Sequence, residues 1–395
     1  MTSLPVVKLF ATAVLLAGFP VFAQSQAPTP STKISRAQRT LPLTKFYDTP
    51  VPLPAGRPGE LIRSEPFYEY LLPYEVSAFR ILYHSRSPNG EDVAVSGVVL
   101  LPDGTPPAGG WPVIAWAHEF TGSARQCAPS LLRNLNEGPL LSMYVGLGYA
   151  VVASDFAGLG TSFPHAALDV RSNALDVINS VVAARAALPQ LGTRWVVAGY
   201  AQGSLVAVGV AEAGSGIGDH KYLGAIGISG LAEPKEFFEH LAQGPSYSVL
   251  VFVARGIKAV YPQFRVEEML TDKAMLLYVH VSHACDASSG PVPAANEMLR
   301  PGWGNNPYVK EFFARNTLGR KLAYGPLLIG GETDTSVPSA LTATAVARLC
   351  EQKDRVLFVK YPSLNASTVL GNSVSEQVSW IRARFSGLPP PGNCP

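Results

Sequence analysis

Apolar residues along the chain fall into two kinds of run, one continuous and one with helical spacing. Four continuous runs rich in β-forming residues predict strands, at residues 113–117, 150–154, 195–198 and 225–228. Near-continuous apolar strands are typical of a parallel sheet that is covered on both faces. Between the second and third of these runs, residues 168–187 place apolar side chains at the spacing of a helix.

The two ends of this pattern complete the predicted sheet. Residues 79–83 and 93–101 resemble an antiparallel pair of strands, with a turn between them at Ser87-Pro-Asn-Gly90. Late in the chain, two strands are predicted at residues 326–329 and 356–359, and two helices at residues 340–349 and 374–385. An antiparallel opening followed by strand–helix units predicts an α/β fold with a mostly parallel, doubly wound sheet.

One long segment, residues 233–318, breaks this alternation. It is rich in aromatic residues close to Gly or Pro and lies between two predicted strands. We expect a helical cap inserted over the carboxyl edge of the sheet, where it would form an apolar pocket for a small molecule. The core would then comprise residues 46–232 and 319–395. The alternative is an additional layer that only buries apolar surface.

The N-terminus has the features of a secretory signal. Lys8 precedes an apolar stretch at residues 9–22, and Val21-Phe22-Ala23 fits a cleavage site. We predict a signal peptide at residues 1–23, a linker rich in Ser, Thr, Pro and Gln at residues 24–45, and a secreted or periplasmic protein. The stretch is short for a membrane span, which needs about 20 residues. A retained anchor is the alternative, and no later segment predicts a membrane-spanning helix.

Composition narrows the class of protein. Hydrophobic residues make up 47% of the 395 residues and charged residues 15%, which favours a large folded core and excludes a disordered chain. The formal net charge of +2 gives no reason to expect nucleic acid as a partner. Zinc-type spacing of Cys and His, a P-loop and a dinucleotide fingerprint are all absent from the sequence. We therefore expect no metal and no cofactor, and nothing indicates the oligomeric state.

The chain contains four cysteines, at positions 127, 285, 350 and 394. An even number in an exported chain favours two disulfides, although four cysteines allow three pairings. We favour Cys127 with Cys285 and Cys350 with Cys394, because the second pair would tie the C-terminal tail to the last helical segments. Free buried thiols are the alternative.

The segment Trp195-Val-Val-Ala-Gly-Tyr-Ala-Gln-Gly-Ser-Leu205 carries the most information about chemistry. An apolar strand runs through Gly-x-Ala-x-Gly into a helix of small residues. A Gly-x-Ser-x-Gly turn in this context is a nucleophile elbow, which exposes the catalytic serine at its tip. Here the tip is Ala201, whose methyl group cannot attack a carbonyl. Ser204 lies one helical turn further on, so we do not expect it to replace the nucleophile.

A catalytic acid is predicted after the strand at residues 326–329. Asp334 lies in the loop that follows this strand, where a triad carboxylate would orient and stabilise an imidazole. Glu332 is a second candidate, and a helix-capping role for Asp334 is the alternative.

The histidine of such a triad is missing from the sequence. It would follow the strand at residues 356–359, in the loop formed by residues 362–368, but no histidine occurs after His283. Ala366 stands where we expect the base. Two of the three triad positions are thus occupied by alanine.

The oxyanion hole would use backbone N–H groups on two loops. One is the amide of Gln202, which follows the nucleophile position, and the other comes from the loop Trp116-Ala-His-Glu-Phe-Thr-Gly122, through Glu119 or Phe120. A glycine usually follows the histidine of such a loop. A carboxylate at position 119 would be unfavourable beside a developing oxyanion, unless the side chain of Glu119 points to solvent.

With these motifs the sequence resembles the secretory lipase family of α/β-hydrolases. The resemblance spans most of the chain after residue 79 and is carried by Trp116-Ala-His118, Ala153-Ser-Asp-Phe-Ala-Gly-Leu-Gly-Thr161, Gly199-Tyr-Ala-Gln-Gly-Ser204, Gly331-Glu-Thr-Asp334 and Val337-Pro338. It implies hydrolysis of carboxylic esters such as acylglycerols, a capped acyl pocket and an extracellular location. It also implies that Ala201 and Ala366 occupy the serine and histidine positions and that Asp334 is the acid.

Three functional hypotheses remain open at this stage. The chain can be an ester hydrolase inactivated at its nucleophile and base, or a natural pseudoenzyme that binds a hydrophobic ester or acid. The third hypothesis is an active esterase with an unconventional site around His118, Glu119 and Asp334. In each case the expected partner is a small-molecule or lipid ester, or its acid.

Overall fold

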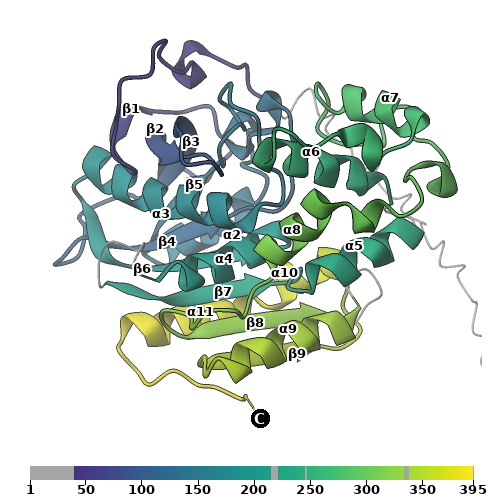
Figure 1. The fold of residues 1–395 in the computed structure, drawn as a ribbon. Helices are drawn as coiled ribbons and strands as arrows, with labels where there is room; N and C mark the ends of the chain where they lie inside the picture. The colour runs from purple at the N-terminus through teal and green to yellow at the C-terminus, as the bar shows by residue number, and fades with distance from the viewer. Residues whose placement is uncertain (1–39, 215–220, 245–246, 333–337, 395) are drawn as a thin grey trace, which may run out of the picture. The chain divides into compact units, whose positions relative to one another are not determined.

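Nine strands form one twisted sheet in the part of the chain that the computed structural model describes, residues 40–394 except 215–220, 245–246 and 333–337 (Figure 1). The predicted signal peptide and most of the predicted linker lie outside these residues. The strands are β1 (Leu61–Pro66), β2 (Val76–Arg86), β3 (Asp92–Pro102), β4 (Trp111–Ala117), β5 (Ala150–Ser154), β6 (Leu191–Tyr200), β7 (Tyr222–Ile228), β8 (Leu327–Glu332) and β9 (Val356–Tyr361).

The strand order confirms the predicted topology. Across the sheet the order is β1-β2-β3-β5-β4-β6-β7-β8-β9. The pairs from β1 to β5 are antiparallel, and every pair from β5 to β9 is parallel. The direction of winding therefore reverses beside β4, and the sheet is mostly parallel and doubly wound.

Helices cover both faces of the sheet. They are α2 (Gly138–Gly146), α3 (Val170–Ala187), α4 (Gln202–Glu212), α9 (Ser339–Glu351), α10 (Ala366–Asn372) and α11 (Val374–Phe385). Residues of α3, α4 and α9 pack in one apolar cluster with Val113 and Ala115 of β4. Residues of α2, α10 and α11 pack in another with Ile114 and Trp116. Successive side chains of β4 thus alternate between two buried faces, which explains its continuous apolar sequence.

A group of helices, here called the helical insertion, lies between β7 and β8. It contains α5 (Pro234–Gln243), α6 (Leu250–Val260), α7 (Asp272–His280) and α8 (Pro307–Asn316), gathered at one end of the sheet (Figure 1). Its helices share an apolar cluster of their own, and Phe120 and Leu168 from the sheet side pack against that cluster.

Both disulfides have the pairing that the sequence favoured. Cys127 is bonded to Cys285, which joins the segment after β4 to the helical insertion. Cys350 at the end of α9 is bonded to Cys394 near the C-terminus. Among the described residues, no helix is long and apolar enough to cross a membrane.

Candidate functional site

The turn between β6 and α4 has the backbone of a nucleophile elbow. Ala201 stands between the two elements with φ 51° and ψ −115°. A positive φ is strained for a residue with a side chain and persists only where surrounding contacts impose it. Those contacts come from two glycines: a Cβ on Gly199 would lie 2.0 Å from the carbonyl oxygen of Gly203, and one on Gly203 would lie 1.9 Å from that of Ala117. The close approach of three backbone segments therefore fixes the position of Ala201.

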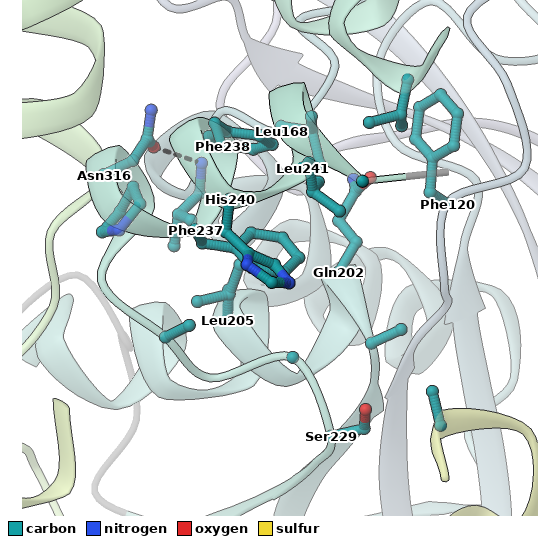
Figure 2. Close-up of a pocket in the computed structure, with 18 of the residues that line it drawn as sticks. Phe120, Leu168, Gln202, Leu205, Ser229, Phe237, Phe238, His240, Leu241 and Asn316 are labelled. Carbon is teal, nitrogen blue, oxygen red and sulfur yellow. Dashed lines mark hydrogen bonds between the residues drawn. The ribbon is translucent and has the colours of Figure 1, made fainter. Parts of the chain in front are cut away.

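A pocket of about 440 Å³ opens beside this turn (Figure 2). Both alanine positions, Ala201 and Ala366, line it, together with Gln202 and Ser229. These residues follow the carboxyl ends of β6, β7 and β9, which is where open α/β sheets bind ligands. The structure therefore brings together two positions that are 165 residues apart in the sequence (201 and 366).

The rest of the pocket wall is mostly apolar. The core contributes Phe120, Leu168 and Leu205, and α5 of the helical insertion contributes Phe237 and Phe238. The aromatic residues of the insertion were noted in the sequence. His240 and Leu241, which also line the pocket, were not, because nothing in the sequence shows which face of α5 is turned towards the sheet.

The expectation that Ala366 lies in a loop is wrong. It is the first residue of α10, and the loop after β9 is limited to residues 362–365. Asn365 caps the helix by accepting a hydrogen bond from the backbone N–H of Thr368, whose hydroxyl is bonded in turn to the N–H of Asn365. The carbonyl of Ala366 accepts a hydrogen bond from the hydroxyl of Tyr200, the residue before the elbow tip.

The residue predicted as the acid, Asp334, lies among residues 333–337, outside the described part of the chain. Glu332, the second candidate, ends β8 and is buried with 3% of its surface exposed. Its carboxylate accepts a hydrogen bond of 2.6 Å from the hydroxyl of Ser229, which lines the pocket.

Of the two loops predicted to form an oxyanion hole, the one after the elbow starts a helix. Gln202 is the first residue of α4, and the first N–H groups of a helix lack partners within it. On the other loop, Phe120 lines the pocket, whereas Glu119 is not among the described lining residues. The carboxylate of Glu119 accepts a hydrogen bond of 2.8 Å from the Asn136 side chain instead.

Two carboxyl groups meet on that side of the elbow. Burial, the charge of Glu119 and a hydrogen bond with it raise the pKa of Glu137 from 4.5 to about 7. The carboxyl of Glu137 is therefore protonated at mildly acidic pH. This arrangement keeps the carboxylate of Glu119 engaged with Asn136 and Glu137.

Neither His118 nor Ser204 lines the pocket among the described residues. Burial lowers the pKa of His118 to about 4, so its ring is neutral, and its two nitrogens lie against the carbonyls of Glu119 and Asp155. Ser204 is fully buried in α4, and its hydroxyl lies beside Gly227 of β7. Both side chains are thus part of the core around the elbow.

The described residues contain no group of His, Cys, Asp and Glu that could hold a metal ion.

Comparison with known proteins identifies a family and a fold. The model of the secretory lipase family matches residues 136–393. The rice cell wall degrading esterase LipA from Xanthomonas oryzae is 21% identical in sequence, with a TM-score of 0.67 over 84% of this chain and 98% of its own. Lipase A from Candida antarctica is 17% identical, with a TM-score of 0.78 over 90% of this chain and 89% of its own. At these identities the two structures show the fold, which is that of the α/β-hydrolases.

No curated protein matches the sequence. The family model covers more than half of the chain, however, and its match includes the elbow, the helical insertion and both strands that follow it. The chain belongs to the secretory lipase family.

Proposed function

We propose that this protein is a secreted ester-hydrolase scaffold that binds a hydrophobic ester or its acid and turns esters over negligibly. The observation that carries the proposal is the residue at the tip of the elbow, Ala201, which lines the pocket but has no nucleophilic atom. The family and the two disulfides support an extracellular location. The predicted signal peptide, residues 1–23, would direct export.

The expected loss of activity follows from how a triad works. Serine and histidine act as one unit, so removal of either lowers the rate by about 10⁶-fold and removal of both lowers it little further. Ala201 removes the attacking oxygen, and Ala366 removes the imidazole that would take its proton. Asp334, which we assign as the acid, would then have no imidazole to orient.

The remaining parts of the site serve binding. In our proposal the backbone N–H groups of Gln202 and Phe120 form the oxyanion hole, and the helical insertion acts as a cap that covers the acyl chain. An intact oxyanion hole and binding pocket can leave about 10³–10⁴-fold acceleration over water. The side chain of Glu119 is held by Asn136, which supports an oxyanion loop whose carboxylate is turned from the reaction centre.

A second candidate function is a natural pseudoenzyme, which binds its ligand without hydrolysing it. The apolar character of the pocket favours this function, because an apolar wall binds a ligand whether or not a nucleophile is present. A non-standard site around His118, Glu119 and Asp334 has less support, since His118 and Glu119 do not line the pocket among the described residues.

Hydrolysis of p-nitrophenyl butyrate and p-nitrophenyl octanoate tests the proposal. We expect no measurable turnover by the chain as given, or by Ala201→Ser or Ala366→His alone. The double variant should gain at least about 10³-fold over either single variant, because nucleophile and base act together. Ser204→Ala in the unchanged chain is the matched control and should alter nothing.

Two results would change the interpretation. Clear activity of the unchanged chain that resists serine-directed inhibitors would overturn the proposal. If the double variant stays inactive while ligand still binds, the pseudoenzyme is favoured over the inactivated hydrolase.

A further inference from the structure

The side chain of Gln202 has an unusual environment. The residue is 6% exposed and lines the pocket directly beside Ala201. Both polar atoms of its amide, Nε2 and Oε1, are shielded from solvent and lack a hydrogen-bond partner within the described structure. In Figure 2 the amide end of Gln202 lies on the side of the pocket where Phe120 is found.

Other polar side chains of the pocket wall are already engaged. The amide of Asn316 accepts a hydrogen bond of 2.7 Å from the N–H of Val170 and donates one of 2.8 Å to the carbonyl of Phe312. The hydroxyl of Ser229 donates to Glu332. Asn316 and Ser229 therefore hold the fold together, whereas the amide of Gln202 contributes no such bond.

An unpaired amide in a buried place is unfavourable, because it has lost its hydrogen bonds to water and gained none in return. Methionine has a similar length and would fill the same space without this cost. Because Gln202 lines the pocket, a ligand there supplies the missing partners once the side chain turns its amide towards it. The chemistry of the amide then determines which ligand fits best.

We propose that the side-chain amide of Gln202 binds the head group of a neutral carboxylic acid whose apolar chain fills the rest of the pocket. This inference rests on the proposed function and specifies its ligand. A neutral acid donates its O–H to Oε1 and accepts an N–H from Nε2, so both amide atoms are satisfied. An ester or an ionised carboxylate offers only acceptors and leaves Oε1 unpaired. The pocket thus favours the acid, the product of ester hydrolysis, over the ester.

The charged groups around the pocket do not replace this contact. His240 is the titratable side chain in the described wall, and it is exposed to solvent. Glu332 is behind Ser229 and bonded to it, and Glu119 is bonded to Asn136. A primary amide carries the same pair of donor and acceptor as the neutral acid and does not titrate. The affinity for a primary amide therefore tests the contact with Gln202 without any contribution from a charge pair between the ligand and His240.

Calorimetric titration of the full-length mature protein with octanamide and with methyl octanoate tests the inference. The quantity compared is the ratio of the two affinities. We expect the affinity for octanamide relative to methyl octanoate to fall about tenfold in Gln202→Met, because both ligands accept the N–H of Nε2 but only the amide donates to Oε1. Leu205→Met, in the apolar wall of the same pocket, is the matched control and should shift both affinities together.

The possible results distinguish the inference about Gln202 from the proposed function. If both ligands bind and the ratio is the same in Gln202→Met, the inference is wrong while the proposed pocket stands. If neither ligand binds, both fail. Gln202→Met should be at least as heat-stable as the parent protein when empty, since it removes an unpaired buried amide.

As a check on the parent protein alone, N,N-dimethyloctanamide, which has no N–H donor, should bind at least about tenfold more weakly than octanamide. Equal binding would also overturn the inference.

Discussion

The two alanine positions of the site are held in place by different means. At Ala201 three backbone segments approach so closely that neither Gly199 nor Gly203 could carry a side chain, and a positive φ results. At Ala366 the backbone is an ordinary helix start that is fixed by the cap of Asn365. The elbow is therefore maintained by packing contacts that do not involve a hydroxyl, whereas the backbone at position 366 depends on a short local motif.

The strongest test of this difference is Gly203→Ala. Its Cβ would meet the carbonyl oxygen of Ala117 at 1.9 Å, so a strand or the start of α4 must shift. We expect a loss of about 4 kcal/mol or more in the free energy of unfolding, measured by urea denaturation. Gly371→Ala is the control in α10, where a Cβ would meet nothing within 4 Å. It should stabilise by about 0.5–1 kcal/mol; a similar loss at both positions would contradict the comparison.

Near the elbow, the carboxyl pair Glu119 and Glu137 predicts that the stability of the fold depends on pH. The pKa of Glu137 is raised to about 7, so its protonated form is favoured by folding. This stabilisation is fully present below a pH of about 4.5 and is lost as the pH rises through 7. Because the carboxyl is partly exposed, we expect about 1–2 kcal/mol after allowance for solvent screening.

The measurement is the difference in unfolding free energy between the parent protein and Glu137→Gln at pH 5 and at pH 8. The difference removes the contribution of other groups, such as the buried Asp176, whose pKa is also raised by burial to about 7. The loss of stability between the two pH values should be smaller in the variant. An identical loss would show that Glu137 does not titrate as described.

A smaller effect is expected at the elbow tip itself. Ala201→Gly relieves the strain of a positive φ, and we expect a gain of about 1 kcal/mol in unfolding free energy. Ala343→Gly, at an exposed position inside α9, is the matched control and should cost about 1 kcal/mol. Opposite signs in thermal or urea unfolding support an imposed backbone at Ala201. A loss at both positions would mean that the turn is relaxed.

An effect of similar or smaller size is expected at position 366. Asn365→Ala removes the cap of α10 and should lower the unfolding free energy by about 1 kcal/mol, whereas Asn365→Ser keeps a capping hydroxyl and should cost only a few tenths. Added to the double variant Ala201→Ser with Ala366→His, Asn365→Ala should also lower turnover. Unchanged turnover would show that the cap does not orient position 366.

Much of the fold could be predicted, because continuous apolar runs coincide with strands that are buried on both faces. The antiparallel strands, the parallel strands and the helix α3 all occur within a few residues of their predicted ends. Strand β1 and the helices α2 and α10 were not predicted. Strand β1 alternates weakly, with half-buried residues such as Leu61 and Arg63, and helix α2 begins with Gly138 and Pro139. Neither sequence carries a clear periodic signal.

The site was predictable where a motif fixes the backbone. Gly199 and Gly203 mark the elbow, and its geometry follows from their lack of a side chain. The start of α10 at Ala366 was missed, although Asn365 and Thr368 are a recognisable capping pair. The unpaired amide of Gln202 could not be foreseen, because the sequence motif fixes the backbone of the turn and not the partners of the side chain that follows its tip.

The disulfide between Cys127 and Cys285 restricts how the pocket can admit a molecule. It tethers the helical insertion, beyond the end of α7, to the segment that follows β4. The chain already attaches the insertion to the core after β7 and before β8, so the bond is a third covalent attachment. While it is intact, the insertion, which carries Phe237 and Phe238 at the pocket, cannot swing away from the core about its two chain ends alone.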